Sequence, residues 1–231
     1  ESLKDLADGN GKFFQVLKKA THPLITVGAA VNAARADWNG FAVLHNAAGR
    51  VGGLDLGFVP GEGGKGVAGM LGETDLLFLL GADEIDMAKT GGAFVVYIGT
   101  HGDAGAHRAN VILPAAAYTE KSGTYVNTEG RVQHTNRAGF APGDAREDWA
   151  ILRALSDVLG KKLPFDSLPQ LRAKLYGEYP HLARIDQVLA GSADDVARAA
   201  KLGGRLNKGT FTSPVKDFYL TNPIARASAV M

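Results

Sequence analysis

Short apolar runs that lead into glycine constrain the fold of this chain more than any other feature of its sequence. Three such runs occupy residues 24–30 (LITVGAA), 75–80 (DLLFLL, followed by Gly81-Ala82-Asp83) and 94–98 (FVVYI, followed by Gly99). A fourth run, residues 110–113 (NVIL), stops at Pro114, which has no N–H to donate to a sheet. Runs of this kind, separated by helix-length or loop-length spacers, are typical of buried parallel strands. We therefore predict an α/β fold with a mainly parallel sheet.

The sequence pattern divides the whole chain into three parts. We predict an α/β domain over residues 1–140, a helical segment of the same domain over 141–203 and an extended C-terminal tail over 204–231. Glycines near residue 10 break the opening stretch into two pieces, and residues 49–72 hold ten glycines in 24 residues, which predicts a long loop. Residues 123–135 alternate around Thr128-Glu129-Gly130, as in a β-hairpin.

Helices are expected after the hairpin. Asp144 and Glu147 form a pair that resembles a capping box, and they predict a helix from Glu147 to Leu159 that ends at Gly160. Further helices are expected over residues 167–176 and 194–202.

Charge and cysteine content exclude several classes of function. With 25 Lys and Arg against 24 Asp and Glu, the net charge of +1 gives no field to recruit nucleic acid. The chain has no cysteine, which excludes disulfides, cysteine-ligated zinc, iron–sulfur clusters on cysteine, thiolate nucleophiles and a cysteine ligand to molybdenum within these residues. The apolar runs are far shorter than the roughly 20 residues that span a bilayer. The first residue is Glu1, and we expect the chain to be part of a longer protein.

Three groups of residues are candidates for chemistry, and each has a structural alternative. Residues 61–66 (GEGGKG) match G-x-G-x-x-G, but Pro60 stands where a dinucleotide site has a buried strand, so a chance match is favoured. His101 and His107 flank a loop with Asp103, a spacing compatible with zinc or a general base, although no third partner is indicated and a backbone-bonded histidine is more common. The remaining histidines are His22, His45, His134 and His181.

The third group lies in and before the hairpin: Glu120, Lys121, Glu129 and Arg131. These residues either act as acid, base or anion anchor, or form the salt bridges that fix the hairpin, and the second reading is favoured. No serine stands in a G-x-S-x-G elbow, so that type of hydrolase lacks its nucleophile. We therefore assign no catalytic, cofactor-binding or metal-binding residue.

Residues 109–135 (ANVILPAAAYTEKSGTYVNTEGRVQHT) closely resemble a signature of the molybdopterin oxidoreductase superfamily. Four flanking segments resemble one branch of it, the large iron–sulfur subunit of respiratory complex I: residues 54–61 (LDLGFVPG), 78–83 (FLLGAD), 143–160 (GDAREDWAILRALSDVLG) and 216–228 (KDFYLTNPIARAS). The resemblance covers essentially the whole chain and places it in the carboxyl-terminal part of such a subunit.

The resemblance implies a fold of molybdopterin-oxidoreductase type without the cofactor, and a structural role in the peripheral arm of the complex. It implies 4Fe-4S and 2Fe-2S clusters in the amino-terminal part of the full subunit. The implied partners are that iron–sulfur region, the flavin-containing NADH-binding subunit and the quinone-side subunits, on the cytoplasmic side of a bacterial inner membrane or the matrix side of a mitochondrial one. The alternative is part of a pterin-dependent molybdenum or tungsten oxidoreductase, in which the hairpin at residues 127–131 approaches a pterin.

Overall fold

The chain forms two compact units in a computed structural model that describes residues 2–21, 25–28, 41–45, 47–189, 191–201, 213 and 217–230. The first unit comprises Glu1–Val51, Val126–Arg131 and Gln187–Pro214, and the second comprises Gly52–Tyr125, Val132–Asp186 and Val215–Met231. The domain boundaries placed at residues 140 and 203 stay predictions.

The first unit begins with two helices, so the predicted break into two pieces is confirmed, although no helix was predicted for the first piece. These are α1 (Ser2–Ala7) and α2 (Gly11–Lys19), and the backbone turns between them with positive φ at Gly9 and Gly11. A parallel pair of strands follows, β1 (Ile25–Gly28) and β2 (Phe41–Leu44). The strand expected within residues 24–30 is therefore confirmed, whereas β2 was not predicted. The unit also contains α8 (Ala193–Ala200), close to the helix expected at 194–202.

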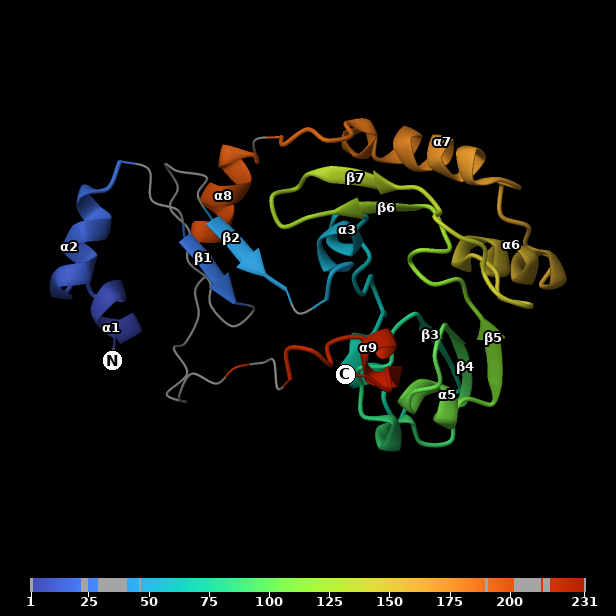
Figure 1. Cartoon of the computed structure of the whole chain (residues 1–231). Coiled ribbons are helices and arrows are strands. Elements are labelled where there is room, and N and C mark those ends of the chain that lie inside the picture. The colour runs from blue at the N-terminus through green and yellow to red at the C-terminus, as the bar shows by residue number, and fades with distance from the viewer. Residues whose placement is uncertain are drawn as a thin grey trace. The chain divides into compact units, whose positions relative to one another are not determined.

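The second unit is built on a three-stranded parallel sheet with the order β3-β4-β5 (Figure 1). The strands are β3 (Leu76–Leu80), β4 (Phe94–Gly99) and β5 (Val111–Pro114), and Leu76 is in register with Phe94. Pro114 ends β5, where its missing N–H costs no ladder bond. The α/β class and the parallel sheet are confirmed.

The core lies on both faces of β4. On one face, Val95 and Tyr97 pack with Leu77 and Leu79 of β3. On the other face, Val96 and Ile98 pack against Ile151 and Leu152 of helix α6 (Asp148–Val158).

Strand β3 buries one face rather than two, which corrects the expectation of a fully buried strand. Leu77 and Leu79 are buried, whereas Leu76, Phe78 and Leu80 are exposed. The exposed side chains lie on the same face of the sheet as Val96 and Ile98 of β4. On that face α6 packs on β4, and the side chains of β3 stay exposed.

The glycine-rich stretch is not one continuous loop, which corrects a second expectation. It holds two short helices, α3 (Arg50–Asp55) and α4 (Val67–Met70). Neither helix contains a buried residue, which explains why the sequence shows no apolar periodicity at these positions. A 3₁₀ turn, η1 (Met87–Thr90), precedes β4, and α5 (Ala104–Arg108) follows it.

The predicted hairpin is present. It pairs β6 (Gly123–Val126) with the antiparallel β7 (Val132–Thr135), and Gly130 supplies the positive φ of its turn, 78°. After α6, the chain continues through α7 (Leu168–Glu178), which Ser167 caps, and the 3₁₀ turn η2 (Pro180–Ala183).

Helix α6 matches the helix predicted over residues 147–159 to within one residue at each end, but the capping role predicted for Asp144 is wrong. Its N-cap is Glu147, not Asp144, and the Glu147 carboxylate accepts a hydrogen bond from Trp149 Nε1 at 2.6 Å. The cause is an extra extended pairing, in which Arg146 forms a parallel bridge with Ala115 and its carbonyl accepts from Ala116 N at 2.8 Å. Residue 146 is thereby kept out of the helix.

The predicted extended tail contains a helix where it is described. Residues 223–227 form α9 (Pro223–Ala227), which Asn222 caps by accepting a hydrogen bond from Ala225 N at 2.9 Å. Most of residues 202–216 lie outside the described residues, as does His22. None of the helices in the described ranges is long and apolar enough to cross a membrane.

Candidate functional site at the carboxyl end of the sheet

The loops that follow β3 and β4 leave the sheet at the same edge, because the two strands are parallel and in register. Asp83 follows β3, and Asp103 follows β4 as the N-cap residue of α5. In open α/β sheets, this carboxyl edge is where ligands bind. It is therefore the strongest candidate for a functional site in this unit.

Asp83 is a buried carboxylate with a defined set of donors. Its side chain is 1% exposed, and Oδ2 accepts a hydrogen bond from the backbone N–H of Gly105 at 2.8 Å. The approach depends on glycine, because a Cβ at position 105 would lie 2.7 Å from the Asp83 Cβ. The first turn of α5 thus packs directly on Asp83.

A single guanidinium joins the two loops. Arg226 of α9 donates from one terminal nitrogen to Asp83 at 3.0 Å and to Glu84 at 3.3 Å, and its Nε donates to Asp103. The Arg226 hydrogen bond holds the pKa of Asp103 below its ordinary value. Figure 1 shows the red helix α9 in the same region as the green helix α5.

Tyr97, on strand β4, borders the site. Its hydroxyl donates to the backbone carbonyl of His101 at 3.0 Å. Burial, and then the charge of Asp83, raise the pKa of this hydroxyl. Tyr97 therefore acts as a neutral donor that orders the loop after β4.

Three carboxylates around one guanidinium leave this edge acidic. A phosphate-bearing pterin, the cofactor that the fold implies, needs donors and positive charge, whereas carboxylates repel phosphate. The cation present, Arg226, already donates to Asp83, Glu84 and Asp103. The residues at this edge do not fit such a cofactor.

His101 and His107 each take part in the local structure of the segment that follows β4. His101 Nδ1 lies 2.8 Å from the Thr100 hydroxyl, and His107 lies in α5, in the last turn. Asp103, which the sequence placed between them as a possible ligand, is paired with Arg226. Within the described part of the chain, no group of three or more His, Cys, Asp or Glu is arranged to hold a metal.

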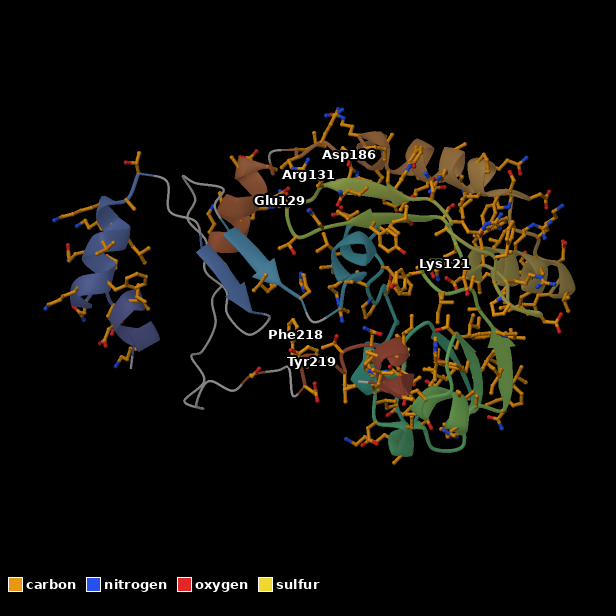
Figure 2. All side chains as sticks on the ribbon, viewed as in Figure 1. Lys121, Glu129, Arg131, Asp186, Phe218 and Tyr219 are labelled. Carbon is orange, nitrogen blue, oxygen red and sulfur yellow. The ribbon has the colours of Figure 1, made fainter. Side chains whose placement is uncertain are left out.

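The four charged residues around the hairpin all have partners within the protein. Glu120 accepts from the backbone N–H of Ala117 at 2.9 Å, and Lys121 pairs with Asp148 in the first turn of α6. Glu129 and Arg131 lie 3.5 Å apart in the loop between β6 and β7, where Figure 2 labels them. These contacts match the structural reading of the four residues.

The G-x-G-x-x-G segment forms a tight turn between α3 and α4. Gly64 N donates to the Gly61 carbonyl at 2.9 Å, so one of the N–H groups that would face a phosphate is already used. Gly66 is the N-cap of a four-residue helix. The segment follows a helix and not a buried strand, so the context of a dinucleotide site is missing.

The remaining described histidines lie on other elements of the chain. His134 on β7 contacts the Tyr176 hydroxyl at 2.7 Å and stacks on its ring. Partial removal from water, and then the nearby Arg172, hold the pKa of His134 below its ordinary value. His181 lies 3.5 Å from Asp55, and His45 follows β2.

Arg226 and its pairing with Asp83 were missed by the sequence analysis. The residues are 143 positions apart, and no local pattern joins them. A partial signal was present in Asn222-Pro223, which is a typical helix start with an Asn N-cap and Pro at the first helical position. This signal could have placed α9, although not its partner.

Family comparison assigns the chain. A model of molybdopterin oxidoreductases matches residues 1–158. The chain belongs to the molybdopterin oxidoreductase family. A second model, which describes the C-terminal region of an NADH-ubiquinone oxidoreductase subunit, matches residues 184–231, the part that contains α9.

Relatives extend this similarity along the chain. It is 38% identical over 251 residues to the NADH-ubiquinone oxidoreductase 75 kDa subunit of Reclinomonas americana, covering 100% of this chain and 36% of that protein. It is 40% identical over 252 residues to the mitochondrial NADH dehydrogenase (ubiquinone) iron-sulfur protein 1 of Solanum tuberosum, covering 100% of this chain and 33% of that protein. An NADH-quinone oxidoreductase subunit of Rickettsia bellii is 38% identical over 249 residues, covering 99% of this chain and 35% of that protein. The chain thus spans about a third of the length of these relatives.

Proposed function

We propose that this chain is a structural, cofactor-free portion of the large iron–sulfur subunit in the peripheral arm of a complex I-type NADH:quinone oxidoreductase. The observation that carries the proposal is the pairing of Arg226 with Asp83, Glu84 and Asp103, which fills the ligand edge of the sheet with the protein's own side chains. Similarity to complex I subunits over the whole chain supports the same assignment.

The iron–sulfur clusters then belong to other parts of the full subunit. The chain has no cysteine, so cysteine-held 4Fe-4S and 2Fe-2S clusters need ligands outside these residues. In this proposal the chain supports its own iron–sulfur region, the flavin-containing NADH-binding subunit and the quinone-side subunits. It sits on the cytoplasmic side of a bacterial inner membrane, or on the matrix side of a mitochondrial one.

Metal and pterin analysis of the purified complex tests the proposal. We expect iron at several atoms per subunit, neither molybdenum nor tungsten at stoichiometric level, and no pterin released on oxidation. The measurement is elemental analysis by mass spectrometry together with fluorescence of oxidised pterin. Stoichiometric molybdenum or tungsten with pterin would overturn the structural assignment and support the alternative, a pterin-dependent oxidoreductase.

A further inference from the structure

Residues 217–230, which we name the C-terminal strap, reach the sheet edge at helix α9, where Arg226 pairs with Asp83. Ala225 is the buried apolar residue of the strap. Phe218 and Tyr219, labelled in Figure 2, are 78% and 68% exposed, and Val230 is 95% exposed. The strap is therefore held to the sheet with little apolar burial.

Ion pairs of Arg226, rather than apolar burial, hold the strap at the sheet edge. In the described ranges, Arg226 is the one Lys or Arg within ion-pair distance of Asp83, Glu84 or Asp103. The Asp83 side chain is 1% exposed, and a buried carboxylate without a partner is strongly unfavourable. The ion pair thus stabilises both the buried carboxylate at the sheet edge and the position of the strap.

The strap also has the local order that a latch requires. Asn222 caps α9, and Pro223 occupies its start, so the short helix is favoured by its own sequence. The helix carries Arg226 in its last turn, next to the buried Ala225. A guanidinium can donate in several directions at once, as this three-carboxylate contact requires.

We propose that the C-terminal strap is an electrostatic latch that closes the carboxyl end of the β3-β4-β5 sheet, with Arg226 as its single fastening residue. The strap takes the place that a ligand has in an open α/β sheet. It opens as a unit when the Arg226 contact is lost, while the sheet and the hairpin stay folded. This inference goes beyond the structural function proposed above and holds whether or not the chain belongs to complex I.

Hydrogen exchange of the full chain tests the latch. In Arg226→Ala we expect amide exchange about tenfold or more faster in residues 223–228, and faster exchange at Gly105, whose N–H bonds to Asp83. Exchange in β6 and β7 should not change. The matched control is Arg198→Ala, which removes an exposed arginine paired with Asp195 on α8. It should leave the strap unaffected.

Coupling identifies the partner. Asp103→Asn alone should also speed exchange of residues 223–228, and the double variant with Arg226→Ala should match Arg226→Ala rather than exceed it. Where Arg226→Ala does not fold, Arg226→Lys carries the test, since the three donors of a lysine sit on one nitrogen, whereas Arg226 bonds to Asp103 and to Asp83 and Glu84 from two separate nitrogens. Exchange in the strap equal to wild type in the foldable variant, or an additive double variant, would overturn the proposal.

Discussion

At Gly105, the absence of one methyl group allows α5 to pack on the Asp83 side chain. A Cβ there would lie 2.7 Å from the Asp83 Cβ and 3.0 Å from a ring atom of Tyr97. Both neighbours are buried, so neither can move without disturbing the core.

Gly105→Ala is therefore expected to destabilise the fold by about 1–3 kcal/mol, beyond the roughly 1 kcal/mol that alanine gains over glycine in a helix. Urea unfolding followed by circular dichroism measures the change. Gly102→Ala is the control, because nothing lies within 4 Å of a Cβ at that position. Equal stability of the two variants would contradict the close packing of Asp83 on α5.

His134 gives the fold a dependence on pH. Its pKa is lowered in the folded state, so the folded protein disfavours the protonated imidazole and the unfolded chain binds more protons. The groups that face it are Tyr176, Arg172 and Asp186.

We expect the free energy of unfolding to fall as the pH decreases below about 6.5, the ordinary histidine pKa, because the unfolded chain then takes up a proton that the folded protein disfavours. His134→Gln keeps a side chain that can bond to Tyr176 and should reduce this loss. Urea unfolding at several pH values measures both slopes. An unchanged slope in the variant would mean that another group causes the pH dependence.

At the scale of elements, the β6-β7 turn depends on Gly130. Its φ of 78° lies in the left-handed region, which β-branched residues resist. The Asn127 side chain also accepts from Glu129 N at 2.9 Å and Arg131 N at 3.0 Å, and both hydrogen bonds stabilise this turn.

Gly130→Val should therefore cost about 1–3 kcal/mol. Under the function proposed above, it should also weaken assembly of the subunit into its complex and leave the cluster potentials unchanged. Native gel electrophoresis of the complex and redox titration of the clusters measure these effects. Gly139→Val is the control, because a Cβ there meets nothing within 4 Å and its φ is not in the left-handed region. Normal assembly with shifted potentials would refute the structural assignment of the hairpin.

Elements were predictable where their signals are local. β3, β4 and the hairpin follow from apolar runs and glycine positions, and α7 follows from its Ser167 cap. The N-cap residue of α6 was not predictable, because the bridge between Arg146 and Ala115 joins residues distant in sequence. Helices α3 and α4 were not predicted, since neither has a buried face.

At the scale of the whole molecule, sequence alone supplied the family and the chemistry that the chain lacks. The missing cysteines exclude cysteine-held clusters within these residues. The candidate site was harder to predict from the sequence. Its central contact, between Arg226 and Asp83, joins helix α9 to the loop that follows strand β3. Such a contact follows from tertiary packing and not from any short motif.

The sequence distance within that contact also sets an order of events during synthesis. Arg226 follows Asp83 by 143 residues, so the residues of the sheet, 76–114, are all made well before Arg226. A nascent chain folds from its amino-terminal side, and closing a long loop has an entropic cost. Asp83 therefore has no Arg226 partner until residue 226 has been made, and in that interval water or another donor must satisfy its carboxylate.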